Sequence, residues 1–175
     1  MDEILLLEQF KIFAESSGVD RAMSEHDAEE MRRIFEKHHI AWVSRLWGLS
    51  ALRTASLMGH AEIISVLFEY GVQVIHEDES TVSPLCVACA GYSWMSKNPD
   101  FPGTVKLLIA HGANLQEKNE LGRGLLHYVA MSAAPSSIEV ASILMEHGIH
   151  INTLSYHNET PMFVACSSHV REYGT

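Results

Sequence analysis

Two cysteines lie at the spacing that thiol redox enzymes use and that supplies half of a zinc site. Cys86 and Cys89 form a CxxC motif, and thiolates so spaced can exchange disulfides or bind zinc. A zinc site would need a second ligand pair, and none has helical spacing nearby. Cys89 also shares its place in an internal repeat with Ser56, Ala130 and Cys166. We therefore interpret this position as one that requires a small side chain, not sulfur.

Histidine is abundant, which makes metal binding a second candidate chemistry. The chain has eleven histidines, and His147 with His150, or His38 with His39, would be the simplest ligand pairs. Four histidines fall instead on positions that recur along the chain: His60, His111, His127 and His147. We expect structural or solvated roles for them, and no metal or other cofactor.

No catalytic motif stands out. The sequence has no nucleophile elbow, Walker loop, GxGxxG or HExxH pattern. Gly122-Arg123-Gly124 belongs to a turn between repeats and is not a phosphate loop. We therefore expect that the chain is not an enzyme.

Composition and charge narrow the class of protein. The 175 residues fit one domain, and 47% of them are apolar, enough to bury a core. No apolar run is long enough for a membrane-spanning helix. The net charge of −10 disfavours nucleic acid and anionic membranes, and it favours a protein partner with a basic patch.

The start of the chain and its cysteine count suggest a compartment. Met1-Asp2-Glu3 is acidic where a signal peptide is basic. Three cysteines, an odd number, fit a reducing compartment without a disulfide framework. We expect a cytoplasmic protein, with export by a route that leaves no such signal as the alternative.

Three segments end alike and reveal an internal repeat. Each has an apolar pair, a short polar stretch and a glycine, and they cover residues 66–71, 106–112 and 142–148. Such a glycine supplies the left-handed position after the last helical turn. His111 and His147 lie in that turn, where a donor can meet free carbonyl groups.

A second shared pattern lies upstream of each ending. It covers residues 50–55, 83–88 and 124–130, with a fourth copy at 160–165. A hydroxyl residue before proline opens a helix, as in Ser83-Pro84 and Thr160-Pro161. We expect the apolar residue that follows, Met162 in the fourth copy, to face the core.

These segments resemble the ankyrin family, whose signature is Thr-Pro-Leu-His-x-Ala, then Gly-His, then an apolar helix ending in glycine. Residues 59–64 match the Gly-His part closely, and Asn119 and Gly122 fall where the family has its turn residues. The resemblance covers roughly residues 48–168. It implies an all-α solenoid of stacked helix pairs with short hairpin turns, and it implies that His127 bonds to the backbone at the repeat turn.

The repeat spacing locates two insertions. The glycines at 71, 112 and 148 lie 41 and 36 residues apart, against about 33 for the family. The excess falls between the two helices of a repeat, at residues 91–103 and near Ala133-Ala134-Pro135.

We divide the chain into divergent N-terminal capping helices at 1–45 and ankyrin repeats at 46–175. In the first part, residues 2–16 and 28–39 fit helices, and Ser24 with Asp27 fits an N-cap of the second. The repeats cover about 46–78, 79–118, 119–154 and, in part, 155–175. Because Thr175 falls within a repeat, a fragment of a longer chain is one interpretation.

The resemblance implies a protein-protein interaction scaffold, which we expect to be a monomer. The alternative is a targeting ankyrin segment of a larger enzyme or effector. The family's variable positions predict partner-binding residues at Trp47, Leu49, Glu79, Val82, Glu120, Leu121, Arg123, Met131, Tyr156, His157 and Glu159. An ordinary solvated rim is the other interpretation of these positions. We expect Tyr156→Ala or Arg123→Ala to lower affinity with the melting temperature nearly unchanged.

The longer insertion is unusual because it carries Tyr92, Trp94, Met95 and Phe101, whereas loops favour small polar residues. Either these side chains fold back onto the third repeat near its own insertion, or they anchor a partner. We expect packing for Trp94 and exposure for Tyr92 and Phe101.

One asparagine is a candidate for modification. Asn152 lies eight residues after Leu144, in a hairpin. In the family, a leucine at that distance before a hairpin asparagine resembles the pattern that an asparaginyl hydroxylase modifies. The alternative is that Asn152 only bonds the turn backbone.

Overall fold

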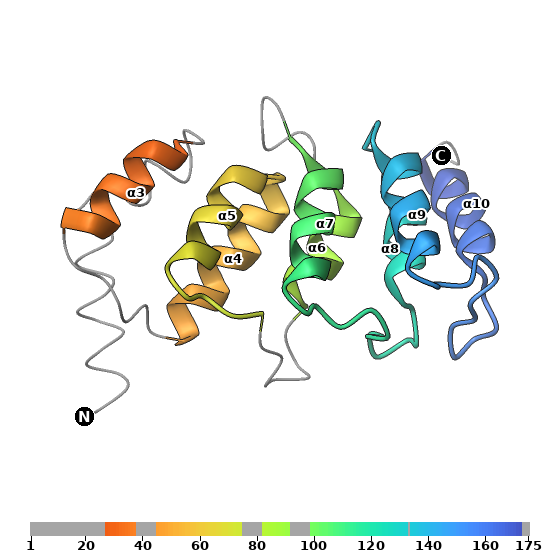
Figure 1. Ribbon diagram of the computed structural model, residues 1–175. Coiled ribbons are helices and arrows are strands. Elements are labelled where there is room, and N and C mark those ends of the chain that lie inside the picture. Colours follow the sequence, from red (N-terminus) through yellow and green to blue (C-terminus); the bar gives the residue numbers. More distant parts are fainter. Residues whose placement is uncertain (1–26, 38–44, 75–81, 92–98, 133, 173–175) are drawn as a thin grey trace.

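The computed structural model describes residues 27–37, 45–74, 82–91, 99–132 and 134–172. In these ranges the chain forms eight helices and no strand, which confirms the all-α class. The helices are α3 (Ala28–Lys37), α4 (Arg45–Met58), α5 (Ala61–Glu69), α6 (Pro84–Ala90), α7 (Phe101–Ala110), α8 (Leu125–Met131), α9 (Ser137–Glu146) and α10 (Pro161–Glu172). They follow one another along a single axis from α3 to α10 (Figure 1).

The helices form two rows. α4, α6, α8 and α10 pack in sequence in a row of first helices, and α3, α5, α7 and α9 pack in a row of second helices. Across the rows, α4 packs on α5, α6 on α7 and α8 on α9. This is the solenoid of stacked helix pairs that the sequence predicts.

The second helices share one packing register. Leu67, Leu108 and Leu144 are all fully buried. The glycine that follows each helix has a left-handed backbone, with φ of +85° at Gly71, +85° at Gly112 and +86° at Gly148. The predicted helix ends are therefore confirmed, and they place one leucine of each repeat in the core.

Side chains fix several helix starts and ends. Ser83 Oγ accepts a hydrogen bond from Cys86 N (3.0 Å) at the start of α6, with Pro84 in its first turn. Asp27 Oδ1 accepts from Glu30 N (2.9 Å) at the start of α3. At the end of α7, His111 Nδ1 lies 2.9 Å from Leu107 O. The bonds to Ser83 and Asp27 satisfy backbone N–H groups that the helix itself leaves unpaired. The His111 ring adds a contact to Leu107 O, which also accepts from His111 N (3.1 Å).

The longer insertion lies where the spacing predicts it, between α6 and α7. Two residues separate α4 from α5, whereas ten separate Ala90 from Phe101. Asp100 anchors the far end, because its Oδ1 accepts from Gly103 N (2.8 Å) and its own N–H donates to Gly59 O (2.8 Å). The second helix of this repeat therefore starts in register despite the insertion.

Phe101 is buried, so the expectation that it is exposed is wrong. Its ring is only 1% accessible because Phe101 opens α7 and fills the space beside two glycines. A Cβ at Gly59 would lie 3.2 Å from the Phe101 ring, and one at Gly91 would lie 3.7 Å from it. The same Cβ at Gly91 would lie 2.9 Å from Ala134 Cβ, so the two insertions meet there.

Candidate protein-binding surface

The hairpin before α8 is shaped by Asn119. Its Oδ1 accepts hydrogen bonds from Leu121 N and Arg123 N, both at 3.0 Å. Its backbone N–H donates to Arg123 O (3.1 Å), and its carbonyl accepts from Gly122 N (2.8 Å). Gly122 has a φ of +72°, a conformation that glycine adopts without strain. The tip residues are therefore held on a closed turn.

The hairpin before α10 uses Ser155 in the same way. Ser155 Oγ accepts from His157 N (3.2 Å) and Glu159 N (3.1 Å), and Ser155 N donates to Glu159 O (3.0 Å). Asn158, with a φ of +58°, takes the place that Gly122 has in the preceding hairpin. Asparagine tolerates this conformation better than most residues. The two hairpins thus present equivalent tips.

The two tips are joined to each other. Tyr156 N donates to Leu121 O (2.9 Å), and a Cβ at Gly122 would lie 2.5 Å from Tyr156 Cδ1. Tyr156 nevertheless keeps 70% of its surface exposed, and Leu121 keeps 42%. Two large side chains are therefore displayed on a backbone that hydrogen bonds fix.

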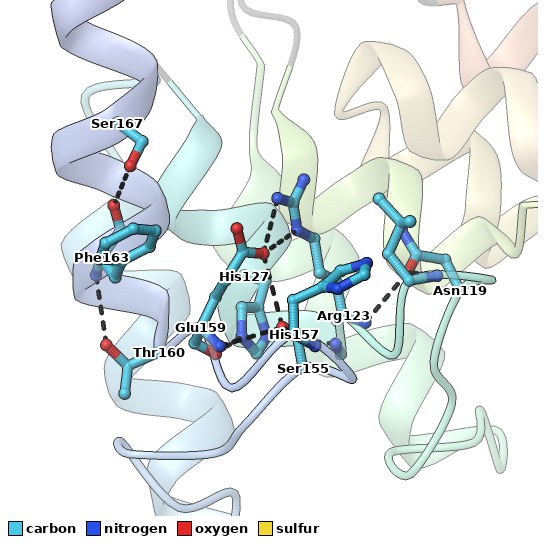
Figure 2. A network of polar contacts seen from close by, with 11 residues as sticks. Asn119, Arg123, His127, Ser155, His157, Glu159, Thr160, Phe163 and Ser167 are labelled. Atoms are coloured by element: carbon cyan, nitrogen blue, oxygen red, sulfur yellow. Dashed lines mark hydrogen bonds and ion pairs between the residues drawn. The ribbon is translucent and has the colours of Figure 1, made fainter.

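An ion pair crosses between the same two repeats. Arg123 Nε and one terminal nitrogen lie 3.1 and 2.8 Å from Glu159 Oε2 (Figure 2). This hydrogen bonding lowers the pKa of the Glu159 carboxyl. Both side chains are about one-fifth exposed, so Arg123 is less free than its place among the variable positions predicts.

His127 bonds to the repeat turns, as the resemblance implies. Gly124 N donates to its Nδ1 (3.2 Å), so the proton lies on Nε2, which donates to Glu159 O (3.0 Å). The ring is fully buried. It ties the start of α8 to the backbone of the next hairpin.

The structure brings part of the predicted surface together. Adjacent tips carry Glu120, Leu121, Arg123, Tyr156, His157 and Glu159, all of them exposed or half-buried. Met131 is 39% exposed at the end of α8, Val82 is exposed before α6, and Leu49 is half-buried in α4. Glu79, Tyr92, Trp94 and Met95 lie outside the described residues, as does the side chain of Trp47.

Several exposed apolar residues escaped the sequence reasoning. Met162 is 73% exposed, so the expectation that it faces the core is wrong. Within the described chain, its helix, α10, packs mainly on α8. The other large apolar residues with open side chains include Ile138, Met145, Ile151, Leu154 and Phe163. No local sequence signal distinguishes Met162 from its buried equivalent, Leu126, one repeat earlier.

The CxxC cysteines are core residues. Cys86 and Cys89 are both buried, and Ser56, at the same repeat position as Cys89, is fully buried too. Burial, with a contribution from Glu117, raises the pKa of Cys86 to about 12, and burial also raises the pKa of Cys89. Both thiols are therefore protonated at neutral pH, which makes them poor nucleophiles.

The described residues contain neither a helix suited to a membrane nor a cluster of metal ligands. Within them, no helix combines the length and the apolar character that crossing a membrane requires. Over the same ranges, no three His, Cys, Asp or Glu side chains gather in an arrangement that could hold a metal ion.

Comparison with known proteins points to one family. Residues 92–173 match the family of ankyrin repeats in three copies. An ankyrin repeat protein of Acanthamoeba polyphaga mimivirus is 30% identical over 90 residues, which are 51% of this chain and 11% of that protein. Protein phosphatase 1 regulatory subunit 27 of Homo sapiens is 32% identical over 75 residues, 43% of this chain and 44% of that protein.

A third relative is a much longer protein. Transient receptor potential cation channel subfamily A member 1 of Drosophila melanogaster is 32% identical over 84 residues, 48% of this chain and 6% of the channel. In all three relatives, the matched stretch spans less than half of the relative's length. Ankyrin repeats are generally protein-protein interaction modules. The family match and these relatives place the repeats of residues 92–173 in the ankyrin repeat family, and the stacked helix pairs agree with that assignment.

Proposed function

We propose that the chain binds another protein through a hairpin-tip site made of Glu120, Leu121, Arg123, Met131, Tyr156, His157 and Glu159. The observation that carries the proposal is the display of Leu121 and Tyr156 on two tips that share a backbone hydrogen bond. A site held in place before binding loses little entropy on association. Tyrosine is also enriched among residues that dominate binding energy. Trp47, Glu79, Tyr92 and Trp94 remain predicted members of the same surface.

The charge of the chain indicates the partner's character. The net charge is −10, and Glu120 is exposed on the tip beside Leu121. A partner with an apolar anchor and a basic surround would complement this surface and associate faster at low salt. We propose that the chain acts as a monomer in the cytoplasm.

A targeting role within a larger protein is the second candidate. The observation in its favour is that the relatives extend far beyond the matched stretch, which is 11% of the mimivirus protein and 6% of the channel. One relative is named a regulatory subunit of a protein phosphatase. In this version the ankyrin stack binds a partner in the same way, and the activity lies in another part of the polypeptide.

The hairpin-tip site can be tested with two truncations. Leu121→Ala and Tyr156→Ala should each weaken binding roughly tenfold or more, because exposed anchors carry a large share of binding energy. Crosslinking and mass spectrometry would identify the partner, and calorimetry would give the affinities. Gln116→Ala, an exposed change in the same hairpin, is the matched control. Equal losses of binding and of unfolding free energy in the two variants would contradict the proposal.

We also propose Asn152 as a hydroxylation site. Leu144 is fully buried, whereas Asn152 is exposed. The backbone N–H of Asn152 donates to His150 Nδ1 (3.2 Å). An enzyme would have to loosen the hairpin to bind this segment in an extended form. Peptide mass spectrometry after incubation with an asparaginyl hydroxylase should show one added oxygen on Asn152. A chain left entirely unmodified under conditions that modify another ankyrin protein would exclude the site.

A further inference from the structure

Two neighbouring repeats hold the hairpin that follows each of them in different ways. In the repeat of α8, His127 accepts a hydrogen bond from Gly124 N and donates one to Glu159 O of the following hairpin (Figure 2). This arrangement, here called the histidine bridge, joins the start of a first helix to the backbone of the next hairpin. Because Nδ1 accepts, the ring that forms the bridge is neutral.

The repeat of α6 has no histidine bridge, because the residue equivalent to His127 is Cys86. A thiol is a weak donor and has no second nitrogen with which to reach the next hairpin. The backbone acceptors differ accordingly. Glu159 O accepts from a backbone N–H and from His127. Arg123 O, its equivalent in the hairpin after α6, accepts only from Asn119 N among the described residues.

A different bond takes the place of the histidine bridge after α6. Ser83 Oγ donates to Glu117 Oε1 (2.5 Å), and Glu117 lies in the following hairpin. The same hydroxyl oxygen accepts from Cys86 N (3.0 Å), so it also caps α6. Ser83 therefore acts at α6 as His127 acts at α8, since each bonds both a helix start and the next hairpin.

The bond between Ser83 and Glu117 is charge-assisted and sheltered from water. A hydroxyl that donates to a carboxylate forms one of the shorter and stronger hydrogen bonds in proteins. Ser83 is 4% exposed, and Glu117 is half-buried. After burial, the charge of Glu117 is the next cause of the raised pKa of Cys86, so the carboxylate lies close to that buried thiol. Such surroundings strengthen the bond.

Glu117 lies at the base of the hairpin that displays Leu121. Two residues after it, Asn119 Oδ1 accepts from Leu121 N and Arg123 N. At Gly124, where the hairpin returns to α8, an added Cβ would lie 3.4 Å from Glu117 O. The backbone of Glu117 thus contacts the returning chain, and its side chain is bonded to the preceding repeat.

We propose that Ser83 and Glu117 are positioning residues for the hairpin-tip site. Their bond replaces the histidine bridge and holds the hairpin of Leu121 from the side of the preceding repeat. From the side of the following repeat, Tyr156 N donates to Leu121 O. A hairpin held from both sides loses little entropy on binding. This role rests on the proposed function, because positioning matters only where Leu121 contacts the partner.

Amide exchange in the full chain tests this role without a partner. Glu117→Ala should speed the solvent exchange of the Leu121 and Arg123 amides roughly tenfold or more, because a charge-assisted hydrogen bond at the base of their hairpin is lost. The His157 amide, in the following hairpin, should exchange as in the parent. Glu120→Ala removes an exposed carboxylate from the same hairpin as Glu117 and is the matched control.

Two further variants test the replacement of the histidine bridge. Ser83→Thr keeps the hydroxyl and should exchange as the parent does. Cys86→His combined with Glu117→Ala should restore slow exchange, because the imidazole can then donate to Arg123 O and complete a histidine bridge. Urea denaturation shows whether each variant is folded.

The possible results separate this role from the proposed function. Exchange that is unchanged in Glu117→Ala, or that rises equally in both hairpins, would overturn the role. A folded double variant that exchanges as fast as Glu117→Ala would show that the carboxylate does not replace a histidine bridge. The loss of partner binding expected for Leu121→Ala depends on none of these results, so the proposed function is decided separately.

Discussion

α8 and α10 are equivalent helices in adjacent repeats, yet their surroundings differ. α8 lies between α6 and α10, whereas α10 packs mainly on α8 among the described helices. Leu126 of α8 is 4% exposed, and Met162, at the same position of α10, is 73% exposed. In a repeat stack, therefore, the burial of a residue depends on whether a further repeat packs over it. It does not depend on the sequence motif around that residue.

The starts of the two helices show the opposite behaviour. Phe163 N donates to Thr160 Oγ1 (3.2 Å) in α10, just as Cys86 N donates to Ser83 Oγ in α6. These caps depend on residues only three positions apart. The helix start is thus a local property that repeats faithfully, whereas burial depends on position in the stack.

Truncating the equivalent apolar residues should expose the largest contrast. Leu126→Ala should lower the free energy of unfolding by about 2 to 4 kcal/mol, because it removes a buried side chain and leaves a cavity. Met162→Ala should cost within about 0.5 kcal/mol, as expected for an exposed site. Urea denaturation of both variants measures the difference. Equal losses would mean that Met162 is covered in solution.

Local features of the fold could be predicted from the sequence. The glycine ends of the second helices, the Ser83 cap and the turn at Asn119 all depend on neighbours within a few residues, and each was predicted correctly. The family resemblance also predicted that His127 bonds to the backbone at the repeat turn, because His127 occupies a recurrent position of the repeat.

Features set by distant neighbours could not be predicted in this way. Phe101 reads as part of a loop, but it starts α7 and is buried beside Gly59 and Gly91. Met162 fits the pattern of a core residue, but no further repeat covers it in the described chain. Arg123 and Glu159 lie 36 positions apart and meet only when two repeats stack. The spacing of residues along the sequence does not by itself predict such contacts between repeats.

The hairpins that precede α8 and α10 offer a second contrast, at Gly122 and Asn158. Gly122→Ala should cost about 2 kcal/mol, because alanine is strained at a φ of +72° and its Cβ would lie 2.6 Å from Tyr156 N. The shift needed would also disturb the Tyr156–Leu121 backbone hydrogen bond. Asn158→Gly places glycine at a left-handed backbone position, which asparagine already tolerates. It should therefore change stability by only a few tenths of a kcal/mol. Urea midpoints measure both changes, and a neutral Gly122→Ala would show that the tips are not held together as described.

Arg123 and Glu159 precede the two helices and form an ion pair. Breaking this pair should give the smallest effect on stability, and the effect should depend on pH and salt. Hydrogen bonding to Arg123 lowers the pKa of Glu159 in the folded chain. A carboxyl with a lowered folded pKa stabilises the fold above its unfolded pKa, and that contribution is lost as pH falls through the folded value. Arg123→Gln should therefore be less stable than the parent at neutral pH, and this difference in stability should disappear in acid.

Added salt should also reduce the difference in stability, because the pair is partly exposed. Urea midpoints from neutral pH down to about pH 3 test this, and a gap independent of pH would mean that Arg123 contributes through packing of its aliphatic stem.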